Sequence, residues 1–377
     1  MSTLSISVFI VNNIQFNLAG EISDFVSFSW SDKFIGYASF ELKAPASATN
    51  IGLLRAGNVI WCGGDNAALI EIIQFDQDDE GEFITVRGRT LEALLTYRVL
   101  REGLFFPNQS VSDVIYAILE SNAVSNSTSQ YRRIPYLSCL KNVTFGEPKS
   151  SELTPALYSN IYDAIYFLCN ANNIGFKIVF NPKDKSLVFK LSVGTNRTSG
   201  DNAVILSTDS EDISPGSYYL NIQDYKNVAL VIGNYDDYGT YPGNFSVTTG
   251  NTSLSGFSRQ EVVINGLDVS DRDENGSVLG ITEFQTRLKN RGNERLANLK
   301  STISYDGEIR TEGGHYKYGV DYFLGDTITL IDTRLNLKIE SQVTEVCDIY
   351  NGADHKQIVT VGHSYPTLYT RIKNQLL

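Results

Sequence analysis

The sequence predicts a mainly β protein with α+β insertions, made of two tube-like antiparallel β-barrel domains and two smaller α+β domains. Three observations predict this class. Short runs of alternating apolar and polar residues fill both ends of the chain, amphipathic helical patterns lie between them, and one pattern near the N-terminus returns near the C-terminus. With 377 residues, 42% of them apolar, the chain is long enough to bury several cores.

The first expected domain, residues 1–101, is a barrel of short strands. Residues 25–30 and 37–42 alternate apolar with polar side chains, and residues 77–82 have the composition of a polar hairpin turn. A short helix at residues 90–97 is expected to close the domain.

The second expected domain, residues 102–213, is α+β. Ser110 or Ser112 can N-cap a helix whose apolar residues recur at helical spacing, and Asn160 can begin a second helix. Residues 176–191 then form two β-rich runs on either side of a turn, which predicts a hairpin.

The second barrel is expected from residues 214–236 and 302–377. An α+β insertion at residues 237–301 interrupts it, with a strand at residues 261–264 and an amphipathic helix at residues 281–299. The chain thus has four expected domains, two of which are barrels.

A short internal repeat connects the two barrels. In each copy a Gly-Asn or Gly-Asp turn precedes a strand, a hairpin follows, and a glycine and then an arginine end the pattern. A repeated pattern predicts a duplicated unit, although two short matches can also arise by chance or from features that all barrels share. The residues of the repeat are Gly57, Asn58, Gly88, Arg98, Gly325, Asp326, Gly362 and Arg371.

Composition restricts the function classes. The chain carries 31 Lys and Arg against 43 Asp and Glu, a net charge of −12, which argues against a general DNA-binding protein because phosphate contacts need clustered basic residues. No segment has the length of apolar residues that a membrane-spanning helix needs, and the N-terminus lacks the features of a secretory signal.

The four cysteines predict neither a disulfide framework nor a zinc site. Cys62, Cys139, Cys169 and Cys347 are far apart and form no C-x-x-C pair, so we expect free thiols in a chain made in a reducing cytosol. No cofactor is expected.

Two acidic segments have the spacing of calcium ligands in part. Asp271, Asp273 and Asn275 resemble the start of an EF-hand loop, but the twelfth position is Thr282 instead of a bidentate glutamate. A polar loop before a helix is favoured, and calcium binding stays open. The segment Asp76-x-Asp78-x-Glu80 has Arg87 at its twelfth position, so a hairpin tip explains it better.

No catalytic site is predicted. His315, His355 and His363 are expected at surface or turn positions, because none lies in a motif of a hydrolase or metalloprotease. The tyrosine-rich residues 235–241 can contact a saccharide or a partner, but a packed surface loop is favoured.

Several motifs, in their order along the chain, give the sequence a family resemblance. It resembles siphophage tail-hub proteins, the N-terminal hub part of tail-associated lysins, which are similar to the central hub of contractile tails and to the hub of type VI secretion spikes. The motifs are Phe28-x-Trp30, Gly36-Tyr-Ala-Ser-Phe40, Thr85-Val-x-Gly88, Glu261-Val-Val-Ile264, Arg291-Gly292-x-Glu294, Tyr305-Asp306-Gly307 and Tyr318-Gly-Val-Asp321 through Gly325-Asp326.

The resemblance implies a homotrimer at the distal tip of the tail. Three chains with two barrels each would form a pseudo-sixfold ring that matches the distal tail protein ring. The tape-measure protein and receptor-binding proteins are further expected partners, and DNA is expected to pass through without specific binding. The acidic composition leads to the hypothesis of a negatively charged lumen.

The expected function is therefore structural: closing the tail tube, joining it to the baseplate or tip, and opening for DNA during infection. Two alternatives are a virion-associated cell-wall-degrading enzyme and a carbohydrate-binding adhesin. The resemblance ends near Tyr365, which leaves no room for a lysin domain and favours a chain without enzymatic activity.

Overall fold

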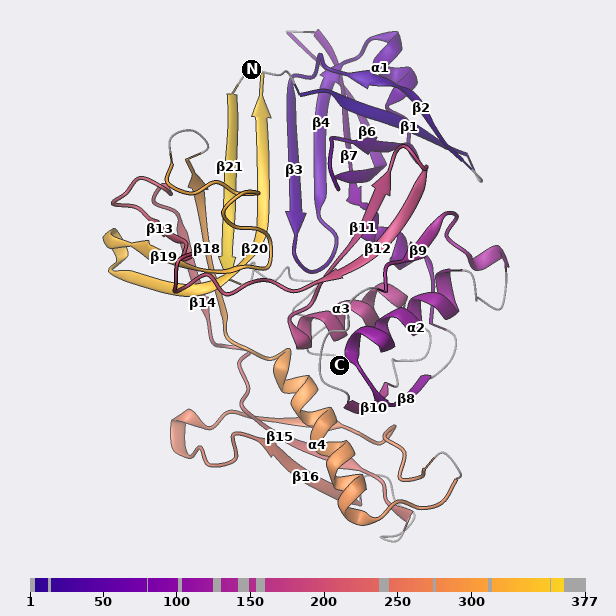
Figure 1. Cartoon of the computed structure of the whole chain (residues 1–377), viewed down its shortest axis with the longest axis vertical. Coiled ribbons are helices and arrows are strands. Elements are labelled where there is room, and N and C mark those ends of the chain that lie inside the picture. The colour runs from indigo at the N-terminus through magenta and orange to yellow at the C-terminus, as the bar shows by residue number, and fades with distance from the viewer. Residues whose placement is uncertain are drawn as a thin grey trace.

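The computed structural model shows a mainly β chain with a small helical part and a separate lower part around one long helix (Figure 1). The structure describes residues 4–12, 15–79, 81–100, 104–124, 130–141, 149–153, 160–236, 244–273, 276–310, 314–352 and 354–362.

The N-terminal unit is an antiparallel sheet with a covering helix. Its strands alternate as expected: Phe28 and Trp30 of one strand and Phe40 and Leu42 of the next are buried on one face, and polar residues occupy the other. The elements are β1 (Ile6–Asn12), β2 (Gln15–Ile22), β3 (Ser27–Lys33), β4 (Ser39–Pro45), α1 (Ala48–Leu53), β5 (Val59–Trp61), β6 (Ala67–Asp78), β7 (Gly81–Thr90) and the 3-10 helix η1 (Leu91–Tyr97).

A helical domain follows. Ser110 caps α2 by accepting the N–H of Asp113 at 3.1 Å, and Asn160 caps α3 by accepting the N–H of Asp163 at 2.8 Å, so both predicted helix starts are confirmed. The elements are β8 (Leu104–Gln109), α2 (Val111–Ala123), the 3-10 helix η2 (Gln130–Arg132), β9 (Leu137–Cys139), β10 (Lys149–Leu153), α3 (Ile161–Asn172), β11 (Gly175–Asn181) and β12 (Ser186–Ser192).

The C-terminal unit is again a sheet, with its own apolar cluster that includes Tyr305, Tyr322 and Val343. Its elements are β13 (Ile205–Ser207), β14 (Ser217–Asn221), β18 (Thr302–Ile309), β19 (Thr327–Asp332), the 3-10 helix η5 (Thr333–Leu335), β20 (Leu337–Asn351) and β21 (Asp354–Gly362).

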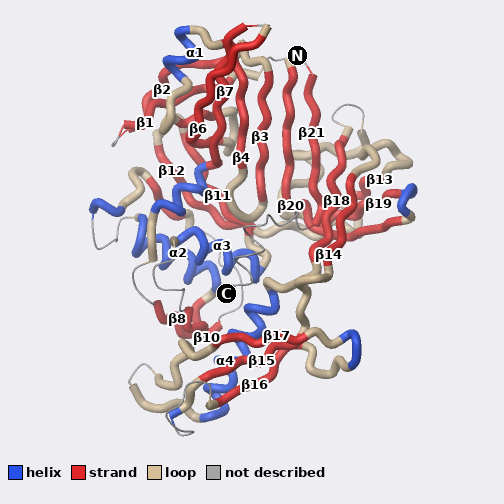
Figure 2. Tube along the Cα trace, turned by 180° about the vertical axis from the view of Figure 1, so that it is seen from behind, coloured by secondary structure: helices blue, strands red, loops and turns tan. Residues whose placement is uncertain are grey.

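The part of the chain built around the long helix α4, which we call the α4 domain, lies away from the strands of the N-terminal and C-terminal units in both views (Figures 1 and 2). The amphipathic helix packs Phe284 and Leu288 against three strands that include Val231. Its elements are β15 (Val228–Gly233), β16 (Phe245–Gly250), the 3-10 helix η4 (Gly256–Ser258), β17 (Glu261–Asn265) and α4 (Ile281–Ala297).

The strands of the two units form one sheet of 13 strands, with the order β14-β18-β21-β20-β3-β4-β7-β6-β5-β1-β2, while β19 and β13 extend from β20 (Figure 2). The prediction of two separate closed barrels is therefore wrong: along the described strands the path ends at β14 and at β2 and does not close. The two units are not separate because the long strand β20 joins them. It pairs with β19 through residues 337–342 and with β3 of the N-terminal unit through residues 345–351.

Two strands lie in other parts than their expected domains. Val228–Gly233 was expected in the second barrel but pairs with β16 and β17 of the α4 domain. Ile205–Ser207 was expected in the second domain but pairs with β19 of the C-terminal unit. Both are short apolar runs, and such runs do not identify the sheet to which a strand belongs.

A largely buried ionic cluster fixes the β11–β12 hairpin to the N-terminal unit. Lys177 Nζ lies 2.5 Å from a carboxylate oxygen of Asp32 and 3.2 Å from the amide oxygen of Asn66. Nearby, the buried Glu92 carboxylate accepts the N–H of Ile178 at 2.8 Å. Burial raises the pKa of Glu92, and although burial opposes the charge of Lys177, the carboxylates of Asp32 and Glu92 raise its pKa overall.

We predict that Lys177→Met lowers the free energy of unfolding by about 3 kcal/mol, because it leaves the carboxylates of Asp32 and Glu92 without their cation. Lys190→Met is the matched control on the next strand, since Lys190 pairs with Asp65 at 3.7 Å in an exposed position and is expected to cost less than about 1 kcal/mol. Urea unfolding measures both, and equal losses would contradict the prediction.

Candidate assembly site

Among the residues that the structure describes, the two β units meet at one strand pairing, which we call the seam: β3 residues Ser27–Lys33 against β20 residues 345–351. On one face Lys33 Nζ lies 3.6 Å from a Glu345 carboxylate oxygen. On the other face the rings of Phe28 and Tyr350 stack with centroids 6.1 Å apart, and the buried Val346 faces Asp32 four residues away. The seam thus continues the sheet and its polar face from one unit into the next, while each unit keeps its own apolar cluster.

The Gly-Asn and Gly-Asp turns of the sequence repeat make the same backbone bonds. The N–H of Gly57 donates to the carbonyl of Ile70, and the N–H of Gly325 donates to the carbonyl of Val343, each at 2.8 Å. The residue after each glycine accepts a bond back from the same strand residue, at 2.9 and 2.8 Å. Both glycines have positive φ, +87° and +91°, which favours glycine at this position.

The side chains after these glycines have different partners. Asn58 donates from Nδ2 to the carbonyl of Leu53 at 2.8 Å. Asp326 is nearly buried and accepts from the N–H of Thr195 at 2.7 Å and from Nε of Arg197 at 2.6 Å. The repeated position therefore fixes a turn in one copy and anchors a neighbouring segment in the other.

Each unit also has a β-bulge at the corresponding place. The pairing of β6 with β7 shifts register between Ile70 and Ile72, and the pairing of β20 with β21 shifts between Val343 and Glu345. In both copies the bulge comes at the strand residue that bonds to the turn, so β6 and β20 correspond residue by residue from this point.

The remaining glycines of the repeat do not correspond. Gly88 faces Ile70, whereas Val361, one residue before Gly362, faces Val343. The pair Gly88 and Gly362 is thus one residue out of register. Each is a glycine for a local reason, since a Cβ at either position would lie 1.7 or 2.1 Å from a carbonyl oxygen of a neighbouring strand.

The structure describes one of the two arginines that end the repeat. Arg98 directly follows η1 and donates from Nη2 to the carbonyl of Arg133 at 3.3 Å and from Nε to the carbonyl of Arg132, which ties the N-terminal unit to the helical domain. Burial lowers the pKa of Arg98. Arg371 lies outside the described residues.

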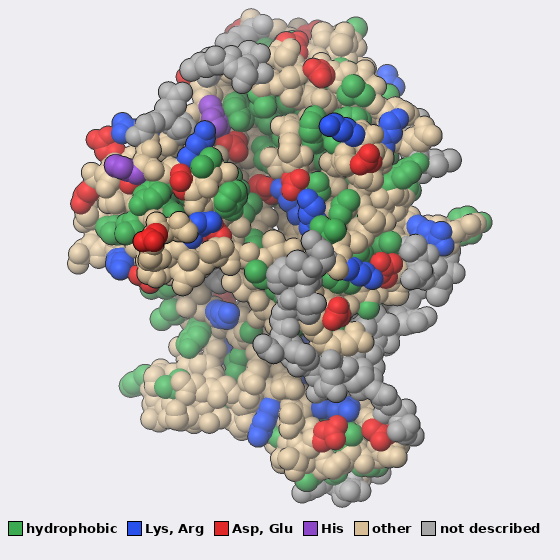
Figure 3. Space-filling view, viewed as in Figure 1, with side chains coloured by type: hydrophobic (Ala, Val, Ile, Leu, Met, Phe, Trp, Pro, Cys, Tyr) green, Lys and Arg blue, Asp and Glu red, His purple; other side chains and the backbone are tan. Residues whose placement is uncertain are grey.

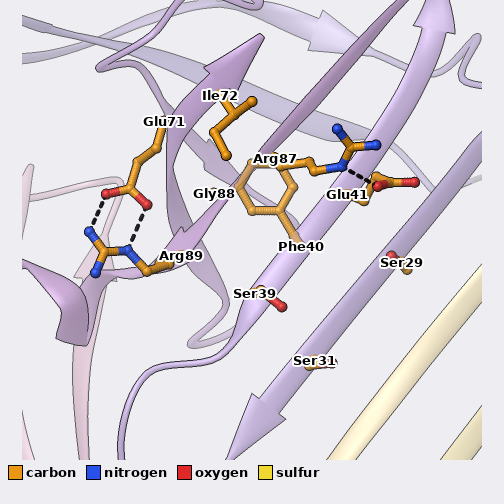
Figure 4. Close-up of a pocket in the computed structure, with 10 residues that line it drawn as sticks. All are labelled: Ser29, Ser31, Ser39, Phe40, Glu41, Glu71, Ile72, Arg87, Gly88 and Arg89. Atoms are coloured by element: carbon orange, nitrogen blue, oxygen red, sulfur yellow. Dashed lines mark hydrogen bonds and ion pairs between the residues drawn. The ribbon is translucent and has the colours of Figure 1, made fainter. Parts of the chain in front are cut away.

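The polar face of the N-terminal unit has a shallow hollow of about 770 Å³ (Figure 4). Arg89 donates from Nε and Nη2 to both oxygens of Glu71, at 2.7 and 2.5 Å, and Arg87 pairs with Glu41. The hydrogen bond from Arg89 lowers the pKa of Glu71, and Glu71 in turn raises the pKa of Arg89. Each arginine is thus neutralised by a carboxylate on a neighbouring strand.

This pattern continues along the polar face into the C-terminal unit. Lys33 pairs with Glu345 across the seam, and Lys356 lies 3.2 Å from Glu308. Figure 3 likewise shows acidic and basic side chains interspersed over the view that it presents. The net charge of −12 is therefore not concentrated around these pairs.

The outer edges of β14 and of the second half of β6 lack a partner strand among the described residues, and both carry exposed apolar side chains. Beyond its bulge β6 pairs only with β7, and Ile72 and Phe75 are 55% and 58% exposed. The strand β14 pairs only with β18, and Tyr218 and Leu220 are 38% and 51% exposed. Sequence reasoning missed these residues because exposure at a sheet edge depends on strand order.

The other candidate residues have structural partners. Asp271 accepts the N–H of Asp236 at 2.9 Å and Asp273 that of Ser277 at 2.8 Å; Asn275 lies outside the described residues. Within the described ranges no group of three or more His, Cys, Asp or Glu could hold a metal ion.

The histidines and cysteines have ordinary surroundings. His315 Nδ1 lies 2.8 Å from Asp212, and His355 Nε2 lies 2.8 Å from Asp348, while His363 falls outside the described part. The four cysteines are free thiols as expected, and burial raises the pKa of Cys62 to about 12. No helix in the described part of the chain is long and apolar enough to cross a membrane.

The fold is that of phage tail proteins. Three solved structures are similar over nearly their whole length: a tail protein from Neisseria meningitidis MC58 (13% identity, TM-score 0.55, 96% of each chain), the 43 kDa tail protein of prophage MuSo2 from Shewanella oneidensis (11%, 0.55, 95% of this chain and 98% of that one) and prophage tail protein gp18 from Listeria monocytogenes EGD-e (13%, 0.51, 99% and 98%).

The chain belongs to the family of Siphovirus ReqiPepy6 Gp37-like proteins, whose model matches residues 7–363. This confirms the resemblance to siphophage tail proteins seen in the sequence. No curated protein matches the chain.

The two turn glycines offer a matched pair of substitutions. Gly57→Ala is predicted to cost about 1–2 kcal/mol from positive φ alone, because its Cβ would enter open space. Gly325→Ala is predicted to cost at least about 3 kcal/mol, because its Cβ would lie 2.3 Å from the Phe34 ring next to the seam. Thermal unfolding compares the two, and equal shifts in Tm would contradict the prediction.

Proposed function

We propose that this chain is a structural tail-hub protein that assembles as a homotrimer at the distal end of a siphophage tail. There it closes the tail tube, joins it to the baseplate or tip, and opens for DNA during infection. One observation carries the proposal: two β units with the same turn, the same bulge and the same strand succession lie side by side through the seam.

The duplicated arrangement supports a ring of six positions. A tail tube is built from rings, and a hub with three chains of two units each offers six similar positions to the ring above it. We propose the distal tail protein as that neighbour, with the tape-measure protein and receptor-binding proteins as further partners. The family membership supports a place in the virion.

The polar face is proposed as the wall of the passage. The apolar face of each unit is covered by the unit's own elements, which leaves the polar face to turn toward the centre of a ring. The hypothesis of an acidic lumen drawn from net charge is replaced by a charge-balanced wall, because the carboxylates Glu41, Glu71, Glu308 and Glu345 are each paired with a cation.

Oligomeric state and position test the proposal. Light scattering of the purified chain is expected to give three times 41.8 kDa, and gold-labelled antibodies are expected to mark the distal end of the tail. A single copy per particle, or labelling elsewhere on the virion, would overturn it. Turbidity clearing of host cell walls by the purified protein would instead support the enzymatic alternative.

We also predict that Glu41→Gln combined with Glu71→Gln creates a DNA-binding surface, because Arg87 and Arg89 lose their carboxylates. Affinity for duplex DNA in fluorescence anisotropy at low salt should rise about tenfold or more, with a salt dependence of about two phosphate contacts per chain. Adding Arg87→Gln and Arg89→Gln should return it to the wild-type level. Unchanged affinity in the double variant would refute a masked passage wall.

A further inference from the structure

The two β units contain corresponding rows of residues that cross their strands. In each unit the row starts at the bulge and runs over three further strands, each step being a pair of directly facing residues. The row of the N-terminal unit is Ile70, Gly88, Phe40 and Trp30, and the row of the C-terminal unit is Val343, Val361, Tyr305 and Tyr218.

The seam shows how the first row continues into the other unit. Trp30 of β3 faces Asp348 of β20, which lies five residues beyond Val343. The corresponding step from Tyr218 of β14 leads to a residue five positions beyond Ile70, which is Phe75 of β6. Within one chain β14 and β6 belong to opposite units and do not pair, so Phe75 must come from a second copy.

We infer that β14 of one copy pairs antiparallel with the second half of β6 of the next copy, in the register of the seam. The inference rests on the proposed ring and names the surface that closes it. The paired residues are Ile72 with Asn221, Ile73 with Leu220, Gln74 with Tyr219, Phe75 with Tyr218, and Asp76 with Ser217.

The chemistry of the two edges matches in this register. Phe75 and Tyr218 face each other, and so do Ile73 and Leu220, all four on the apolar side of their sheets. Phe75, Tyr218 and Leu220 are exposed in the single chain, and pairing removes them from water. On the polar side Asp76 meets Ser217, so no like charges are opposed.

Each copy offers β14 at one end and β6 at the other, so the contact is head-to-tail. Such a contact adds copies in one direction and ends only when the rotation closes a ring. It also covers the edges of β14 and β6, which otherwise present exposed apolar side chains to any other chain. A second copy is favoured as the occupant because the seam already makes this pairing within one chain.

Disulfide cross-linking tests the register. Asp76→Cys and Ser217→Cys, combined in one full-length chain and oxidised with diamide, are expected to give a ladder that ends at three linked copies, because facing residues lie within disulfide reach. The positive control is Ser29→Cys with Ile349→Cys, the same pair in the seam, which should close within one chain. The pair Asp76→Cys with Asn221→Cys is four residues out of register and should give about tenfold less cross-linked product, or even less.

The outcomes separate the inference from the proposed function. A trimer by light scattering that gives no ladder with the facing pair overturns the pairing and leaves the hub proposal standing. A ladder in which the out-of-register pair links equally well also overturns it. A chain that stays monomeric, without cross-links, overturns both.

Phe75→Asp provides a second test that does not depend on cysteines. The variant should remain folded by circular dichroism. The protein concentration at which half of the chains are trimeric should rise about tenfold or more, because a charge then faces Tyr218. Leu18→Asp is the matched control, since Leu18 is 59% exposed on the edge strand β2. Equal losses in the two variants, or none in Phe75→Asp, would contradict the pairing.

Discussion

The pairing of β3 with β20 is the constraint on which the rest of the structure depends. It makes one sheet of two units, and the loop after β3 becomes the place where three parts meet. There Phe34 donates its N–H to the carbonyl of Thr344 at 3.0 Å and accepts the N–H of Phe176 at 3.3 Å. A Cβ at Gly175 or Gly325 would lie within 2.4 Å of its ring, so two glycines make room for this one side chain.

Local features of this fold could be predicted from the sequence, because their causes are local. Side-chain alternation identified the strands β3 and β4, Ser110 and Asn160 marked the two helix starts, and the glycines at positions 57 and 325 marked turns. The strand partners could not be predicted. A short apolar run such as Val228–Gly233 fits several sheets equally well, and only tertiary packing decides among them.

The candidate site shows the same division at the level of single residues. The turn at Asp326 was visible as a repeat, but its anchoring of Thr195 and Arg197 was not, since those residues are more than a hundred positions away. Gly88 and Gly362 looked equivalent because each follows a short run of strand-forming residues, yet they differ by one residue in register. A sequence match compares residue types only. The register of the strands, on which the proposed ring depends, is set by the hydrogen bonds between them.

Charge illustrates why composition alone misleads about a surface. The chain has an excess of acidic residues, and a lumen drawn from that excess would be negative. On the polar face the carboxylates of Glu41 and Glu71 instead hold two arginines by hydrogen bonds across strands. Such pairs stabilise neighbouring strands and leave little field for a phosphate backbone to sense. In the proposed hub, such local neutrality would let DNA cross the passage without binding, independently of the total charge.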